Sequence, residues 1–218
     1  MTPPNKKHKK QKTNPLPDAG SDFVTITIPS GQKFAAHAHM LAHHSEYFRR
    51  ALHSQFQEAT TRTFDLSVHA TEATVSSFVK WIYQQSDKFP DSPFDAQALF
   101  DGLSDRDAVE SWLFGDYIQA TGFRNDLILF MFFNQHFDYR VVVDTWDLLN
   151  PERKLRSFLV SQFCSVVTGR HDVDKLLESL PPTLVLEASK WLFKRLKEEQ
   201  SPRRDKLEFN IYDHLEEM

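Results

Sequence analysis

Four histidines within eight residues, His37, His39, His43 and His44, are the only residues whose types and spacing suggest a metal site. His39 and His43 lie four positions apart, so on a helix their rings could share one ion. Zinc, however, normally takes three or four protein ligands. No cysteine or suitably spaced carboxylate lies near the four histidines. We therefore predict that the chain holds no metal and no cofactor.

The other reactive residue types occur without the patterns that catalysis needs. Cys164 is the single cysteine, and its neighbours Phe163 and Val166 place it on an apolar helix face. Reactive thiolates need polar, electropositive surroundings, which predicts that this thiol is structural. The acidic segment 101–107 lacks the ligand register of a calcium loop. No Gly-x-Ser-x-Gly elbow, phosphate-binding loop or His-Glu-x-x-His pair occurs. We predict that the chain is not an enzyme.

Composition sets the class of protein. The chain has 218 residues, of which 40% are apolar and 19 are phenylalanine, so a sizeable core is expected. Only six glycines occur, which favours helices over a sandwich with tight hairpins. A net charge of −4 gives no sign of a nucleic-acid-coating chain. The single cysteine and the lack of a membrane-spanning apolar run predict a soluble intracellular protein, in the nucleus or the cytoplasm.

The histidines lie where the apolar period changes. Residues 24–28 alternate apolar and polar, whereas apolar residues recur every three to four positions after His37. This change predicts a strand pair that leads into a helix over 39–52. Similar patterns predict a strand at 62–66 and helices at 75–83, 111–120, 123–137, 155–167 and 183–196. Gly122 should end the helix over 111–120. Pro90 and Pro93 predict a loop or insertion at about 86–107, with room for one helical turn near 94–103.

The order of these residues resembles the start of a BTB/POZ domain, a protein-interaction module without catalytic activity. The signature residues follow one another along the predicted strands and helix: Asp22, Phe34, His37, Leu41, Ser45 and Phe48. Trp81-Ile82-Tyr83 and the segment 113–120, with Gly115-Asp116-Tyr117, continue the resemblance to about Phe137. The sequence around Gly115-Asp116-Tyr117 is most similar to the BTB proteins of filamentous fungi. The resemblance implies an α+β fold, with a helical cluster flanked by a small β-sheet.

Most signature residues should serve the fold. A ring nitrogen of His37 can satisfy a backbone group at the junction of strand and helix, and Ser45 can do the same within the helix. Leu41 and Phe48 should be core. Two departures from dimeric BTB domains occur, namely Ala35 in place of a basic residue and a segment at 13–18 without an apolar strand or helix. A swapped homodimer is therefore not expected, and other homodimers stay open.

One short motif suggests a partner. In BTB adaptors of ubiquitin ligases, a hydrophobic-x-Glu element helps to dock a cullin, and Phe56-Gln57-Glu58 stands at that place. A desolvated aromatic residue beside a charged hydrogen-bonding group is a credible hot spot. The alternative is that Phe56 packs internally. The resemblance thus implies binding to other proteins, among them a cullin, and implies no membrane partner.

The pattern divides the chain into four parts. Residues 1–20 should form a disordered basic and Pro-rich tail, 21–138 the BTB/POZ domain, 139–197 an α-helical extension and 198–218 a charged C-terminal tail. Five lysines in the first part form either a nuclear localisation patch or a merely solvated tail: Lys6, Lys7, Lys9, Lys10 and Lys12. An alternative function follows from them, that of a nuclear chromatin- or nucleic-acid-associated scaffold.

Overall fold

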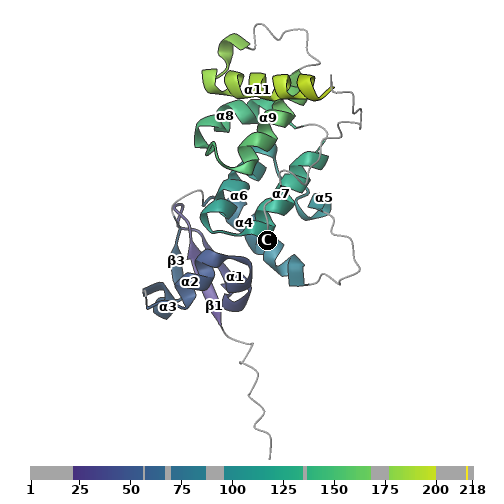
Figure 1. Cartoon of the computed structure of the whole chain (residues 1–218). Coiled ribbons are helices and arrows are strands. Elements are labelled where there is room, and N and C mark those ends of the chain that lie inside the picture. The colour runs from purple at the N-terminus through teal and green to yellow at the C-terminus, as the bar shows by residue number, and fades with distance from the viewer. Residues whose placement is uncertain are drawn as a thin grey trace, which may run out of the picture.

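The computed structural model describes residues 22–55, 57–66, 70–86, 96–134, 137–167, 177–199 and 215. A small sheet and the first helices form one end of the molecule, and the C-terminal helices form the other (Figure 1). The α+β architecture predicted from the sequence is confirmed, with helices far outnumbering strands in the described residues.

The sheet has three strands in the order β2-β1-β3. β1 (Phe23–Thr27) pairs antiparallel with β2 (Lys33–His37) and parallel with β3 (Thr63–Asp65). Gly31 allows the connecting turn because its φ of +84° lies in the left-handed region. Val24 and Ile26 are fully buried, as the alternating pattern predicts for one face of a strand.

The helix predicted over 39–52 is two helices, α1 (Ala38–His44) and α2 (Glu46–Leu52). Ser45 separates them in an extended conformation, with φ −138° and ψ 121°. Its Oγ accepts a hydrogen bond from the Phe48 backbone N–H at 3.2 Å and donates one to the Ile118 carbonyl at 2.6 Å. Ser45 therefore caps α2, because it satisfies an N–H group that the start of a helix leaves free.

The next elements are α3 (Gln57–Thr61), α4 (Glu72–Ser86) and α5 (Ala96–Leu99). α4 contains the predicted helix over 75–83 and extends it at both ends. Of the predicted insertion, residues 87–95 lie outside the described part of the chain, and α5 lies within the predicted helical turn.

Two helices, α6 (Asp105–Tyr117) and α7 (Thr121–Phe133), correct the sequence prediction at their junction. α6 begins six residues before Ser111 because the Ser104 hydroxyl accepts a hydrogen bond from the Asp107 N–H at 3.1 Å. Gly122 does not end α6. It lies in the first turn of α7, where an added Cβ would be 3.2 Å from the ring of Trp81. The chain turns instead at Gln119, whose φ is +55°.

The C-terminal part contains α8 (Tyr139–Thr145), the 3-10 helix η1 (Trp146–Leu148), α9 (Lys154–Val167) and α11 (Pro182–Glu199). α9 and α11 were predicted, and α8 and η1 were not. Val166 was expected on the buried face of α9, but it is 37% exposed. Buried apolar residues run as one cluster from Val24 in the sheet to Ala188 in α11, so the C-terminal helices share the core of the rest.

Candidate protein-interaction surfaces

The signature histidine, His37, forms hydrogen bonds with the hydroxyl of a tyrosine, Tyr83. The backbone N–H of His37 donates a hydrogen bond to the Tyr83 hydroxyl at 3.0 Å, and His37 Nδ1 lies 2.8 Å from the same oxygen. The ring thus contacts a side chain of α4, whereas the sequence predicted a backbone group. The junction itself is closed by the Ala38 N–H, which donates to the Asp22 carbonyl at 2.8 Å.

The other signature residues fall into a buried and an outer group. Leu41, Ser45 and Phe48 are buried, while Phe34 is half-buried. Asp22 is exposed, and its carboxylate lies 3.2 Å from the guanidinium of Arg62. Sequence analysis missed Arg62 because forty residues separate it from Asp22 and no local pattern links the two.

The histidines of the cluster pack against different aromatic side chains. The ring of His37 lies against Phe23, and the ring of His44 lies 5.0 Å from that of Trp81. Within the described ranges, no three His, Cys, Asp or Glu side chains are grouped so that they could hold a metal ion.

Cys164 is buried on α9 and faces α11. Burial raises the pKa of its thiol to about 11, since the apolar surroundings disfavour the thiolate. The thiol is therefore protonated at neutral pH, and it lacks the thiolate character that nucleophilic catalysis requires.

The predicted cullin-docking motif lies only partly within the structure. Phe56 is outside the described residues, and Glu58 is half-buried in α3. The charge of Glu58 also affects the pKa of Tyr47, a half-buried residue of α2. The ring of Tyr47 lies 5.5 Å, centroid to centroid, from that of Tyr117. Burial, with smaller contributions from Tyr117 and the charge of Glu58, raises the pKa of Tyr47 to about 12. Tyr47 therefore stays a neutral hydroxyl at this edge of the molecule.

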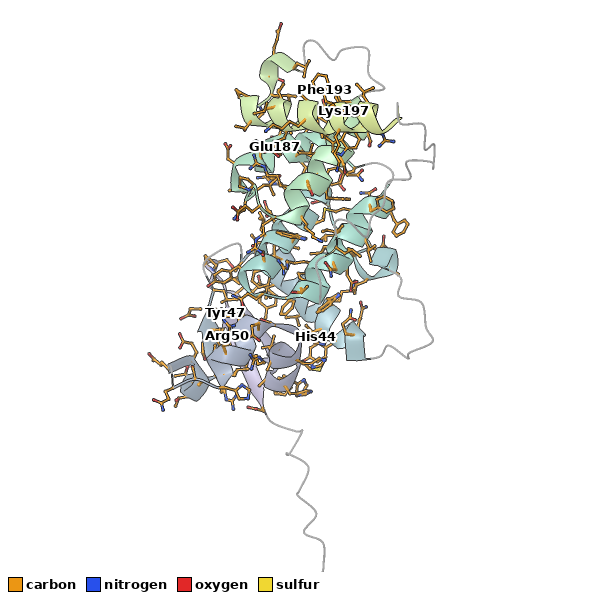
Figure 2. All side chains as sticks on the ribbon, viewed as in Figure 1. His44, Tyr47, Arg50, Glu187, Phe193 and Lys197 are labelled. Atoms are coloured by element: carbon orange, nitrogen blue, oxygen red, sulfur yellow. The ribbon has the colours of Figure 1, made fainter. Side chains whose placement is uncertain are left out.

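Beside Tyr47, α2 carries a compact charged group (Figure 2). The Glu46 carboxylate accepts hydrogen bonds of 2.6 Å from both Arg49 and Arg50. The Arg49 hydrogen bond is the largest cause that lowers the pKa of Glu46 to about 2. Because the group is exposed, it contributes little to stability, but it gives this face of α2 a net positive charge.

The second surface is an apolar stripe on α11, which we define as Leu186, Phe193 and Leu196. These side chains are 54%, 66% and 50% exposed. Phe193 lies on the outer side of α11, whereas Glu187 lies on the side toward the rest of the molecule (Figure 2). Three exposed lysines of α11 accompany the stripe: Lys190, Lys194 and Lys197. The helix predicted over 183–196 contains all three residues of the stripe, but periodicity cannot tell whether an apolar face is covered.

No helix in the described part of the chain is both long and apolar enough to cross a membrane. Among curated proteins, none matches the sequence. Residues 14–99 match the family model described as BTB/POZ domain. This range contains all the signature residues from Asp22 to Phe48 together with Tyr83, the partner of His37. From this match, the chain carries a BTB/POZ domain, which is a protein-interaction module, and additional helices follow it.

Proposed function

We propose that the chain is an adaptor that joins a cullin-based ubiquitin ligase to a second protein. The observation that supports this proposal is that α11, which carries the exposed stripe, lies at the opposite end of the molecule from α3 (Figure 1). An adaptor needs two separate docking faces, and large exposed apolar side chains often mark the sites where proteins bind each other.

The α11 stripe supports the substrate-binding half of the proposal. Phe193 offers an aromatic anchor of the type that dominates many interfaces. The adjacent Lys190 and Lys197 favour a partner that combines an apolar side chain with acidic residues. A second copy of α11 would fit poorly, because an antiparallel pair centred between Leu186 and Phe193 would bring the two Lys190 side chains near each other.

The cullin-binding half rests on the motif at Phe56 and Glu58. We expect that the double variant Phe56→Ala, Glu58→Gln recovers at least about tenfold less cullin in co-purification, because loss of two hot-spot residues costs well above 1.4 kcal/mol of binding free energy. The measurement is the amount of cullin recovered with the tagged full chain from cells.

Gln57→Ala is the matched control, since Gln57 is exposed in the same helix and is not part of the motif. Circular dichroism should show the same helix content in all variants. Equal cullin recovery with the double variant and the control would remove the adaptor proposal and leave a scaffold of another kind.

A second candidate function uses the basic segment at residues 6–12, in which five of seven residues are lysine. We propose it as a nucleic-acid contact of a nuclear scaffold. If all five lysines bind phosphates, the slope of log K against log salt should be about −4 to −5 for duplex DNA. Fluorescence anisotropy of labelled DNA measures this slope, and replacing the five lysines by glutamine should abolish it. A full chain that fails to bind DNA at low salt contradicts this function.

The likeness to filamentous-fungal BTB proteins also remains a proposal. It rests on the segment 113–120 and on residues 123–129 after it, which lie beyond the residues that match the family model.

A further inference from the structure

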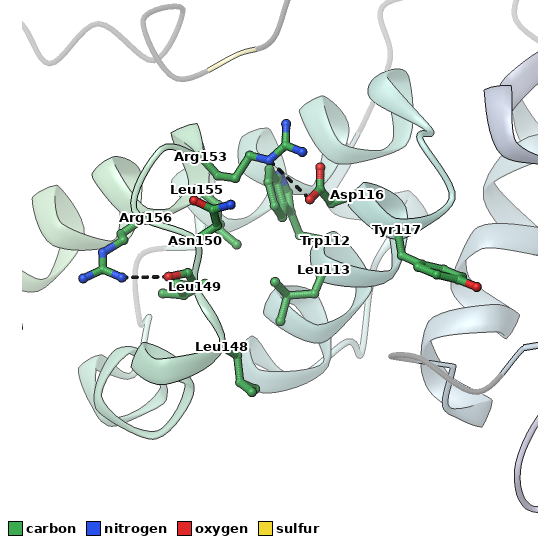
Figure 3. Close-up of a pocket in the computed structure, with 10 residues that line it drawn as sticks. All are labelled: Trp112, Leu113, Asp116, Tyr117, Leu148, Leu149, Asn150, Arg153, Leu155 and Arg156. Carbon is green, nitrogen blue, oxygen red and sulfur yellow. Dashed lines mark hydrogen bonds and ion pairs between the residues drawn. The ribbon is translucent and has the colours of Figure 1, made fainter.

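A pocket of about 240 Å³ lies between α6 and the turn that precedes α9 (Figure 3). The charged groups in its lining have partners within the chain. The Asp116 carboxylate lies 3.4 Å from the guanidinium of Arg153, and the Leu149 carbonyl accepts a hydrogen bond from Arg156 at 2.7 Å. These contacts hold the turn against α6 and α9, so this pocket has a structural explanation that needs no ligand.

Another pocket, of about 220 Å³, lies between α9 and α11 and has an almost entirely apolar lining. The hydroxyl of Ser189 in this lining donates a hydrogen bond of 2.8 Å to the Val185 carbonyl of its own helix. Leu177 and Leu192, which also line the pocket, are exposed, so the pocket opens to solvent. Because an apolar cavity of about 150 Å³ is enough to bind benzene, this pocket has room for one aromatic side chain.

The pocket is continuous with the α11 stripe. Residues four positions apart are neighbours on the surface of a helix. Ser189 and Leu192 line the pocket, and Phe193 and Leu196 of the stripe follow them at this interval. A partner that places a side chain in the pocket therefore brings its neighbouring residues over Phe193.

Two lysines flank the stripe on α11. Lys190 follows Leu186, and Lys197 follows Phe193, at the same interval of four residues. Both lysines are exposed, and in the described part of the chain no carboxylate pairs with either. Glu187, an acid of the same helix, is held by Arg156 at 2.8 Å instead. The lysine side of α11 thus favours acidic groups of a partner.

The width of α11 sets the spacing between the two kinds of contact. A helix with its side chains is about 10–12 Å across, and an extended chain advances about 3.3–3.6 Å per residue. A partner residue that meets Lys190 or Lys197 therefore lies about three or four positions from the residue that enters the pocket. Glu178, next to Leu177 in the chain and exposed, disfavours acidic groups on the other side of the pocket.

We propose that the pocket between α9 and α11 binds an aromatic side chain of a partner peptide, whose acidic residues pair with Lys190 and Lys197. This inference rests on the proposed function for the role of the partner, since it describes the substrate-binding half of the adaptor. The site itself does not depend on a cullin. A lipid surface could use the stripe and the lysines, but it has no side chain at a fixed distance from its charges to match the pocket.

A library of random peptides displayed on phage and selected on the full chain tests the proposal. We expect enriched peptides to carry an aromatic residue with aspartate or glutamate about three or four positions away. Fluorescence anisotropy with a labelled copy of the most enriched peptide then measures affinity. Ser189→Leu should weaken binding at least about tenfold, because the larger side chain takes the space of the aromatic anchor. Lys190→Gln with Lys197→Gln should weaken it about fivefold at low salt and leave it unchanged at high salt.

Ser165→Leu is the matched control for the pocket. The Ser165 hydroxyl also donates to a carbonyl of its own helix, that of Ser161 at 2.8 Å, but Ser165 does not line the pocket. Lys33→Gln is the control for the lysines, since Lys33 is exposed in β2. Both controls should bind the peptide as the unaltered chain does, and circular dichroism should show the same helix content in all variants.

Equal affinity of Ser189→Leu and Ser165→Leu for the peptide would overturn the proposal, as would enrichment of peptides that lack the acidic residues. If no peptide is enriched while the chain sediments with phosphatidylserine vesicles, α11 binds membranes and the proposal is also wrong. Cullin recovery with Ser189→Leu should equal that of the unaltered chain. Failure of this site and failure of the cullin-binding proposal are thus read from separate measurements.

Discussion

Replacing Phe78 by alanine should lower the free energy of unfolding by about 3–5 kcal/mol, the usual cost of truncating a buried phenylalanine. Phe78 of α4 is fully buried. Its ring lies within 6.3 Å, centroid to centroid, of four other aromatic rings, those of Phe48, Trp81, Phe114 and Phe123. These rings come from α2, α4, α6 and α7, so the cavity would open where four helices meet. Urea denaturation followed by circular dichroism measures the loss.

Phe193→Ala is the matched control, since it removes the same atoms from a side chain that is 66% exposed. We expect this variant to change the free energy of unfolding by no more than about 0.5 kcal/mol. The comparison separates burial from residue type. If the two variants were equally stable, Phe78 would not be part of the core, and α4 would not pack against α6 and α7 through this side chain.

The aromatic cluster illustrates what the sequence could predict. The helix predicted over 75–83 has Val75, Phe78 and Ile82 on one face, at intervals of three and four residues, and all three are fully buried. The change of period near His37 likewise predicted the strand pair and the helix that follows. Both predictions use contacts between residues close in the chain, and periodicity reports such contacts directly.

The errors arose where a distant residue decides the local structure. Ser45 breaks the predicted helix partly because its hydroxyl binds the Ile118 carbonyl, 73 positions away. Gly122 was predicted to end a helix, but its missing side chain makes room for the ring of Trp81 instead. In each case the local pattern allowed two outcomes, and tertiary packing selected one.

The candidate sites show the same division. The signature residues His37, Leu41 and Phe48 could be found from their spacing, because the spacing itself is tied to the fold. The Asp22–Arg62 ion pair and the pocket between α9 and α11 could not, since they depend on how separate elements meet. The exposure of Phe193 was equally hidden, because an apolar stripe looks the same in sequence whether it is covered or free.

Replacing Arg156 by methionine should lower the free energy of unfolding by about 2–4 kcal/mol, since it removes the buried partner of an ion pair whose carboxylate, on Glu187, is 31% exposed. Arg156 of α9 is 7% exposed, and its guanidinium donates to Glu187 of α11 at 2.8 Å and to the Leu149 carbonyl at 2.7 Å. It also stacks on Trp146, with 3.8 Å from its central carbon to the ring centroid. Methionine fills similar space but leaves the Glu187 carboxylate and the Leu149 carbonyl without this donor.

The control is Arg106→Met, because Arg106 pairs with Glu110 at 3.0 Å on the surface and is 57% exposed. We expect its cost to stay below about 1 kcal/mol. A double variant, Arg156→Met with Glu187→Leu, should be more stable than Arg156→Met alone, because it no longer leaves a carboxylate without its partner. Urea denaturation gives all these values, and hydrogen exchange should show faster opening of α11 than of α4 in Arg156→Met. Equal costs for Arg156→Met and Arg106→Met would mean that the Arg156–Glu187 pair does not hold α11 on α9, and the α11 stripe would then lack the fixed support that a docking face requires.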